Sequence, residues 1–147
     1  MDQYLGILLI IVIFVVLMVG YFLYLTRPKG SQKGSTFRKV EPSEIRRRWA
    51  EIQAMMREGG PANYRQAIME ADKLIDMVLK SKVRGETMGE RLKNARNLFP
   101  RDAYDKLWTA HKIRNKIAHE ADFEGLSSDA QLAVRNFERA LRELRVI

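Results

Sequence analysis

The longest apolar stretch of the chain lies close to its start, in residues 4–25, which contain no charged side chain. Leu, Ile, Val, Phe and Met occupy most of its positions, so no face of a helix built from it would be polar. A helix of about 22 residues is ~33 Å long, enough to cross a hydrocarbon core of ~30 Å. An acid precedes the stretch, where a signal peptide would carry basic residues. The pattern predicts a transmembrane helix within residues 1–26.

From residue 43 onward, apolar positions recur every three or four residues, the spacing of amphipathic helices. The first such helix is expected to take Ser43 as its N-cap and to end before Gly59-Gly60-Pro61. The second is expected to end at Gly85, and its charged face is expected in solvent. The two apolar stripes are Ile45, Trp49, Ile52 and Met56, then Tyr64, Ala67, Ile68, Ala71, Leu74, Ile75, Val78 and Leu79. The charged face of the second helix comprises Arg65, Glu70, Asp72, Lys73, Asp76 and Lys80.

Three further helices follow from the same periodicity. A short one opens at the capping-box pattern Thr87-Met88-Gly89-Glu90 and closes at Pro100. The next begins near Arg101, and the last is capped by Ser127 or Ser128. The helix after Pro100 presents Tyr104, Leu107, Trp108, His111, Asn115 and Ala118 on one side, and the last has the stripe Ala130, Ala133, Val134, Phe137, Ala140, Leu141 and Leu144. No segment alternates with period two, so we predict an all-α bundle of four or five helices over residues 43–147.

Residues 27–42 are rich in Gly, Ser, Pro and Thr and show no sustained period, which predicts a flexible linker. The net charge of +8 is concentrated there and at the start of the first bundle helix, where only Glu41 and Glu44 oppose the basic side chains. Anionic lipids of the inner leaflet attract such juxtamembrane clusters. We therefore expect lipid contacts from Arg27, Lys29, Lys33, Arg38, Lys39, Arg46, Arg47 and Arg48.

The same charge asymmetry predicts a topology. Asp2 is the only charged side chain before the apolar stretch, whereas basic residues follow it, and the positive-inside rule places a basic flank in the cytoplasm. We expect a single-pass protein of the cell membrane with its N-terminus outside and its C-terminal domain in the cytoplasm. Because lipid attraction accounts for the basic cluster, total charge is weak support for an RNA ligand.

The composition excludes several chemistries. The chain has no cysteine, which rules out disulfides, thiolate metal sites and cysteine nucleophiles. Its two histidines, His111 and His119, would lie ~12 Å apart along a straight helix, too far for one metal ion. No metal site and no cofactor are expected.

The candidate chemistry is concentrated between His111 and His119. Arg114 is a permanent planar cation whose donors suit phosphate oxygens, and His119 can exchange a proton near neutral pH. Asn115 directly follows the arginine. The spacing Arg-Asn-x-x-x-His, late in an amphipathic helix, resembles the motif of HEPN domains. These are small helical bundles, and many are metal-independent endoribonucleases. The resemblance extends over roughly residues 49–144.

The resemblance implies a catalytic site made of Arg114, Asn115 and His119. In such a site His119 moves the proton of a ribose 2′-hydroxyl, Arg114 holds the attacked phosphate and Asn115 orients the groups. Five residues of ideal helix turn ~500°, which leaves Arg114 and His119 ~140° apart around the axis. Either the last turn is distorted, or two protomers complete one site, as in HEPN nucleases. The second alternative implies a homodimer with RNA as its substrate.

A second interpretation stays open. Arg114 could pair with a nearby acid, and Asn115 could satisfy backbone groups. His119 could cap the C-terminus of the helix, where the helix dipole favours a cation. The bundle would then be a non-catalytic dimerisation or docking module for a protein partner of unknown identity. His111, on the same side as Trp108, is expected to serve packing rather than catalysis.

Overall fold

The computed structural model of the chain describes residues 14–19, 40–119 and 126–147, in two compact units, Met1–Thr36 and Phe37–Ile147. In the first unit, residues 14–19 are helical and their apolar side chains are exposed. No helix within the described ranges is long and apolar enough to cross a membrane. The remainder of the predicted transmembrane helix lies outside the described residues, as do the linker positions Arg27, Lys29, Lys33, Arg38 and Lys39.

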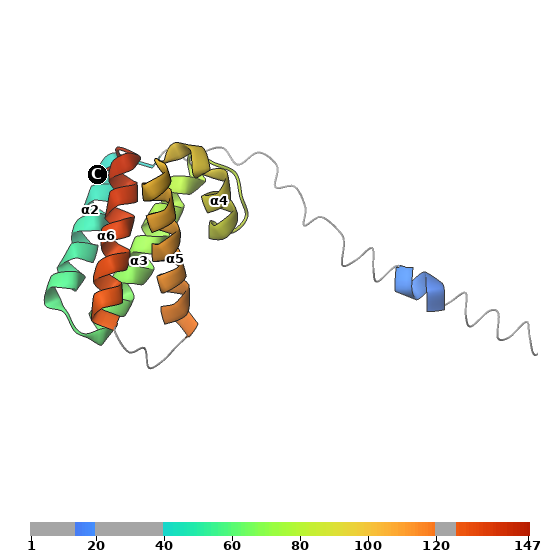
Figure 1. Cartoon of the computed structure of the whole chain (residues 1–147), viewed down its shortest axis with the longest axis horizontal. Coiled ribbons are helices and arrows are strands. Elements are labelled where there is room, and N and C mark those ends of the chain that lie inside the picture. Colours follow the sequence, from blue (N-terminus) through green and yellow to red (C-terminus); the bar gives the residue numbers. More distant parts are fainter. Residues whose placement is uncertain (1–13, 20–39, 120–125) are drawn as a thin grey trace, which may run out of the picture. The chain divides into compact units, whose positions relative to one another are not determined.

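The described part of the second unit is entirely helical, which confirms the all-α prediction, and no strand occurs in it. Helix α3 is central because it packs against α2, α4, α5 and α6, while α5 and α6 also pack against each other (Figure 1). The elements are α2 (Pro42–Glu58), α3 (Pro61–Lys80), α4 (Met88–Asn94), the 3₁₀ turn η1 (Arg96–Leu98), α5 (Arg101–His119) and α6 (Leu126–Glu143).

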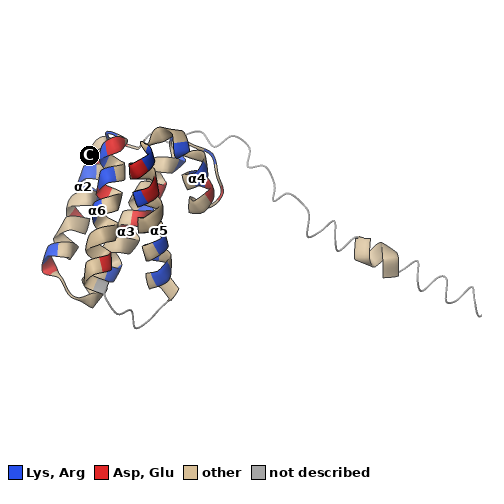
Figure 2. Ribbon diagram, viewed as in Figure 1, with Lys and Arg blue, Asp and Glu red and all other residues tan. Residues whose placement is uncertain are grey.

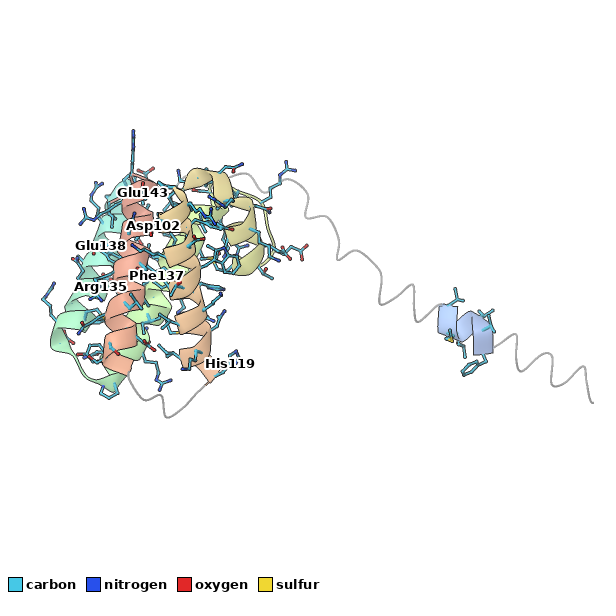
Figure 3. The ribbon with its side chains drawn as sticks, in the orientation of Figure 1. Asp102, His119, Arg135, Phe137, Glu138 and Glu143 are labelled. Atoms are coloured by element: carbon cyan, nitrogen blue, oxygen red, sulfur yellow. The ribbon has the colours of Figure 1, made fainter. Side chains whose placement is uncertain are left out.

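The predicted apolar stripes of α2, α3 and α6 meet in one hydrophobic core. Phe137 of α6 is its largest fully buried side chain (Figure 3). Met56, Tyr64 and Leu144, at the ends of the stripes, are only partly buried. The buried members of the stripes are Ile45, Trp49 and Ile52 of α2, Ala67, Ile68, Ala71, Leu74, Ile75, Val78 and Leu79 of α3, and Ala130, Ala133, Val134, Phe137, Ala140 and Leu141 of α6. These stripes are confirmed.

The buried side of α5 matches the predicted one only in part, because Leu107 and His111 are buried as expected while other members are not. Trp108 and Asn115 are half-buried and Ala118 is exposed, while Ala103, Ala110 and Ile117 lie in the core. The predicted side was the one that contains the large aromatic residues Tyr104 and Trp108. In the fold, α5 packs mainly on α6, and two of its buried side chains, Ala103 and Ala110, are small.

Two of the predicted caps are wrong and one is right. Helix α2 begins at Pro42, with Glu41 as its N-cap, because the fixed φ of proline suits the first helical position and starts the helix before Ser43. Helix α6 begins at Leu126, so Ser127 and Ser128 lie inside its first turn. A serine cap is worth only about 1 kcal/mol, too little to fix a helix start against packing. Thr87 does cap α4, since its hydroxyl oxygen accepts from the Glu90 backbone N–H at 3.2 Å.

Helix α3 ends at Lys80, five residues before the glycine expected to stop it. Gly85 instead lies in the loop to α4, with φ at +150°. A Cβ there would stand 2.9 Å from both the backbone nitrogen and the Cγ of Arg91. The position therefore requires glycine, for reasons of space and of backbone conformation together.

Candidate functional site

Polar side chains on α3 bind the C-terminal half of α5. Arg65 Nη1 donates to the backbone oxygen of Ile117 at 2.8 Å, and Asp72 Oδ1 lies 2.8 Å from His111 Nδ1. The residue numbers rise along α3 as they fall along α5, so the two helices are antiparallel. Arg65 satisfies one of the carbonyls that a helix C-terminus leaves without an intrahelical partner. The prediction that Asp72 faces solvent is wrong, because Asp72 is only 5% exposed.

Four side chains form a closed circuit between α3 and α5, which we call the polar ring: Asp72, His111, Asn115 and Arg114. His111 Nδ1 is hydrogen-bonded to Asp72 Oδ1, and His111 Nε2 lies 3.2 Å from Asn115 Nδ2. Arg114 Nη1 donates to Asn115 Oδ1 at 2.9 Å. Arg114 Nε lies 3.3 Å from Asp72 Oδ2 and closes the ring. Asp72 thus shares its negative charge between a histidine and an arginine.

The contact between Arg114 and Asp72 is an ion pair without a hydrogen bond. Arg114 Nε is buried, and its N–H finds no acceptor in a suitable direction. The Arg114 side chain as a whole is 27% exposed. Asp72 and Asn115 therefore anchor a guanidinium whose side chain is only partly buried.

His111 is buried, as the packing interpretation requires, and the Trp108 ring meets it edge-on at 6.1 Å between centroids. Sequence reasoning missed its carboxylate partner. The available signal was the position of Asp72, which directly follows Ala71 of the buried α3 stripe and therefore stands at the edge of that stripe.

His119 stands apart from the polar ring. It is the last residue of α5, its side chain is exposed, and it makes no hydrogen bond or ion pair to any described residue (Figure 3). Helix α5 stays α-helical through His119, so the distorted last turn that would bring Arg114 and His119 together does not occur. Within the described chain, the fold joins two of the three predicted site residues, Arg114 and Asn115, and leaves His119 separate.

The charges on α5 differ between its two halves (Figure 2). Acids occur only in the first half, where Asp102 pairs with Lys106 and with Arg139 of α6, and a hydrogen bond from Lys106 lowers the pKa of Asp102. The second half carries Lys112, Arg114 and Lys116 without an acid. The C-terminal half of α5 is therefore richer in basic side chains than the first half.

A second polar cluster ties α4 to α3. The buried Arg91 donates through Nε to Asp76 Oδ1 and through Nη1 to the backbone oxygen of Gly85, both at 2.6 Å. Lys80 pairs with the other carboxylate oxygen of Asp76 at 2.8 Å. Burial alone would raise the pKa of Asp76, but the hydrogen bonds from Arg91 and Lys80 outweigh it and lower that pKa.

No group of three or more histidine or acidic side chains within the described ranges could hold a metal ion. Comparison of the chain with models of protein families, with curated proteins and with solved structures finds no match. The site must therefore be interpreted from its own geometry.

Proposed function

We propose that residues 43–147 form a HEPN-type module that cleaves RNA without a metal ion and works as a homodimer. The observation that carries this proposal is the state of the two charged motif residues. Arg114 is anchored by Asp72 and Asn115 yet partly open to solvent, and His119 is exposed without a partner among the described residues. Such cleavage needs two groups, a fixed cation that can bind phosphate and an imidazole that is free to exchange a proton.

In the proposed reaction, His119 accepts the proton of the ribose 2′-hydroxyl as that oxygen attacks the neighbouring phosphorus. The bond from phosphorus to the 5′-oxygen of the next nucleotide breaks, that oxygen takes a proton from water, and the products are a 2′,3′-cyclic phosphate and a 5′-hydroxyl. Arg114 stabilises the charge that develops on the phosphate oxygens, and Asn115 fixes the guanidinium.

The regular helix supports the proposed dimer. With α5 undistorted, Arg114 and His119 of one chain diverge by ~140° around its axis, and in the proposal a second protomer supplies the complementary group to each. The test is incubation of single-stranded RNA with the chain in the presence of a chelator. We expect cleavage with cyclic phosphate ends, and intact RNA after prolonged incubation would contradict the proposal.

A second candidate function is a non-catalytic docking or dimerisation module. It is favoured by the charge of Asp72, which offsets that of Arg114 and weakens its attraction for phosphate. In this alternative the polar ring is a structural network, and the partner is an unidentified protein.

We further propose that an N-terminal transmembrane helix within residues 1–26 anchors the module to the cell membrane, with the bundle in the cytoplasm. The uncharged stretch and its one-sided basic flank support this. A reporter active only outside the cytoplasm, fused after Ile147, is expected to stay silent, and a fluorescent cytoplasmic reporter is expected to work. Deleting residues 1–26 should move the protein to the soluble fraction. An active external reporter would reverse the topology.

The basic cluster next to the membrane is proposed to contact anionic lipid. Arg47 pairs with Glu44 and Glu51, and Arg48 pairs with Glu44, whereas Arg46 is exposed and makes no ion pair within the described ranges.

We expect residues 27–147 to bind anionic vesicles, and 1 M salt to abolish binding by shortening the screening length to ~3 Å. Arg46→Gln should cost about 1 kcal/mol of binding, and Arg48→Gln less, because Glu44 already offsets the charge of Arg48. Vesicle co-sedimentation measures both. Equal binding to neutral vesicles would contradict the assignment.

A further inference from the structure

We infer that Asp72 and His111 are positioning residues that fix the orientation of Arg114, Asp72 by direct contact and His111 through Asn115. The inference extends the proposed function, and the part of it that concerns catalysis rests on that function. It assigns a task to two buried residues outside the Arg-Asn-x-x-x-His motif. One of them, Asp72, comes from a different helix.

The order of donors and acceptors around the polar ring admits one arrangement. A carboxylate only accepts, so His111 Nδ1 must carry the proton that is donated to Asp72. A guanidinium only donates, so Asn115 must turn its oxygen towards Arg114. The Asn115 amide nitrogen then points at His111, and His111 Nε2 must accept from it. Each side chain fixes the next, and His111 is held as the neutral tautomer protonated on Nδ1.

This arrangement restricts Arg114 at two points. Its Nη1 is held by Asn115, and its Nε is held close to the carboxylate of Asp72. A guanidinium has five N–H donors, and those that the ring does not use remain for a phosphate. Loss of Asp72 would release the Nε edge and let the guanidinium rotate.

Stability alone does not explain the ring. Buried charged networks are often no more stabilising than apolar side chains of the same volume, so such a network is weak support for a purely structural role. Arg114 also leaves the Nε donor without an acceptor, which a network optimised for stability would avoid. A network that holds one cation partly open to solvent is suited to positioning that cation.

The matched test uses two aspartates of α3. Asp72→Asn removes the charge that faces Arg114, while Asp76→Asn makes the same change one helical turn away, in the cluster with Arg91. The probe is the full chain in detergent micelles with ¹⁵N-labelled histidine and arginine. The chain has only two histidines, so His119→Ala assigns both rings.

The expected spectrum shows His111 as the Nδ1-protonated tautomer and Arg114 with a distinct Nε–H signal. Asp72→Asn should broaden or shift the Arg114 signal to that of a freely rotating guanidinium, and Asp76→Asn should leave it unchanged. An Nε2-protonated His111, or equal disturbance of Arg114 by both variants, would overturn the inference. If Asp72→Asn does not fold, Asn115→Ala serves instead. It should release Arg114 in the same way, and an unchanged Arg114 signal would overturn the inference.

An RNA cleavage assay of the same variants tests this inference separately from the proposed function. With RNA as substrate, Asp72→Asn should lower kcat by up to ~100-fold with a smaller change in KM, since misplacement of one group by ~1 Å has effects of that size. Asp72→Glu, which keeps the charge, should recover part of the rate. A wild-type chain that does not cut RNA removes the proposed function, while the Arg114 signal still decides the positioning. If Asp72→Asn cut RNA at the wild-type rate while its Arg114 signal showed free rotation, the positioning of Arg114 would have no part in catalysis.

Discussion

Replacing His119 with alanine is expected to slow RNA cleavage by ~10²–10⁴-fold, because the substitution removes the group that carries the proton of the attacking hydroxyl. His119 is exposed at the end of α5 and outside the core, so the variant should keep its melting temperature. Arg114→Ala should be comparably damaging, and Arg114→Lys should recover little activity because an ammonium lacks the planar fork. Gel analysis of single-stranded RNA in a chelator measures the rates.

Mixing two inactive variants tests whether the site is composite. If Arg114 of one protomer acts with His119 of its partner, a heterodimer of Arg114→Ala and His119→Ala retains one intact site and recovers activity. DNA should survive under all conditions because it lacks the 2′-hydroxyl. His111→Ala should lower the melting temperature, since it leaves Asp72 buried without its hydrogen-bond partner, and should also slow cleavage, since Asn115 loses the side chain that orients it towards Arg114.

One result would favour the docking module. It is a folded dimer that cuts no RNA and whose melting temperature falls when either Arg114 or His119 is replaced. That pattern would assign both residues to a structural network rather than to a reaction.

Arg91→Ala is expected to lower the free energy of unfolding by about 3 kcal/mol at neutral pH, because it removes one partner of a buried ion pair. The Arg91 side chain is 5% exposed, and its loss leaves Asp76 in a part-buried place with Lys80 alone. Lys80→Ala should cost less than about 1 kcal/mol, since Lys80 is the exposed partner. Urea denaturation followed by circular dichroism measures both. An equal effect of the two variants would contradict this account.

The pH dependence provides a second check. Since the pKa of Asp76 is lowered by folding, its contribution to stability is present above the ordinary carboxyl value of 3.8 and is lost as the pH falls through the folded pKa. In Arg91→Ala the burial of Asp76 persists while one hydrogen bond that lowers its pKa is gone. Protonation of Asp76 therefore removes part of the cost of burying its charge in Arg91→Ala. The free energies of unfolding of the wild type and the variant should converge as the pH falls. A constant difference across pH would exclude Asp76 as the cause.

Several features of the fold were predictable because local rules determine them. The apolar stripes of α2, α3 and α6 follow from the helical period, and Thr87 follows from the capping box. The break before α5 follows from the restriction that Pro100 places on the residue before it, since Phe99 is extended. The motif residues Arg114, Asn115 and His119 were visible from their spacing alone.

What the sequence by itself determined, then, is the all-α class, the order of the helices, most of the core and the three candidate site residues. Only the tertiary structure decided the partners of the charged side chains. Asp72 and Asp76 look alike on an isolated α3, yet one meets His111 and Arg114 of α5 and the other meets Arg91 of α4. The periodicity of a helix indicates which of its faces is apolar. It does not indicate which neighbouring helix lies at each edge of that face, because that depends on how the helices pack. The structure also decided against a distorted last turn, because α5 remains a regular helix to its last residue and so keeps His119 away from the polar ring.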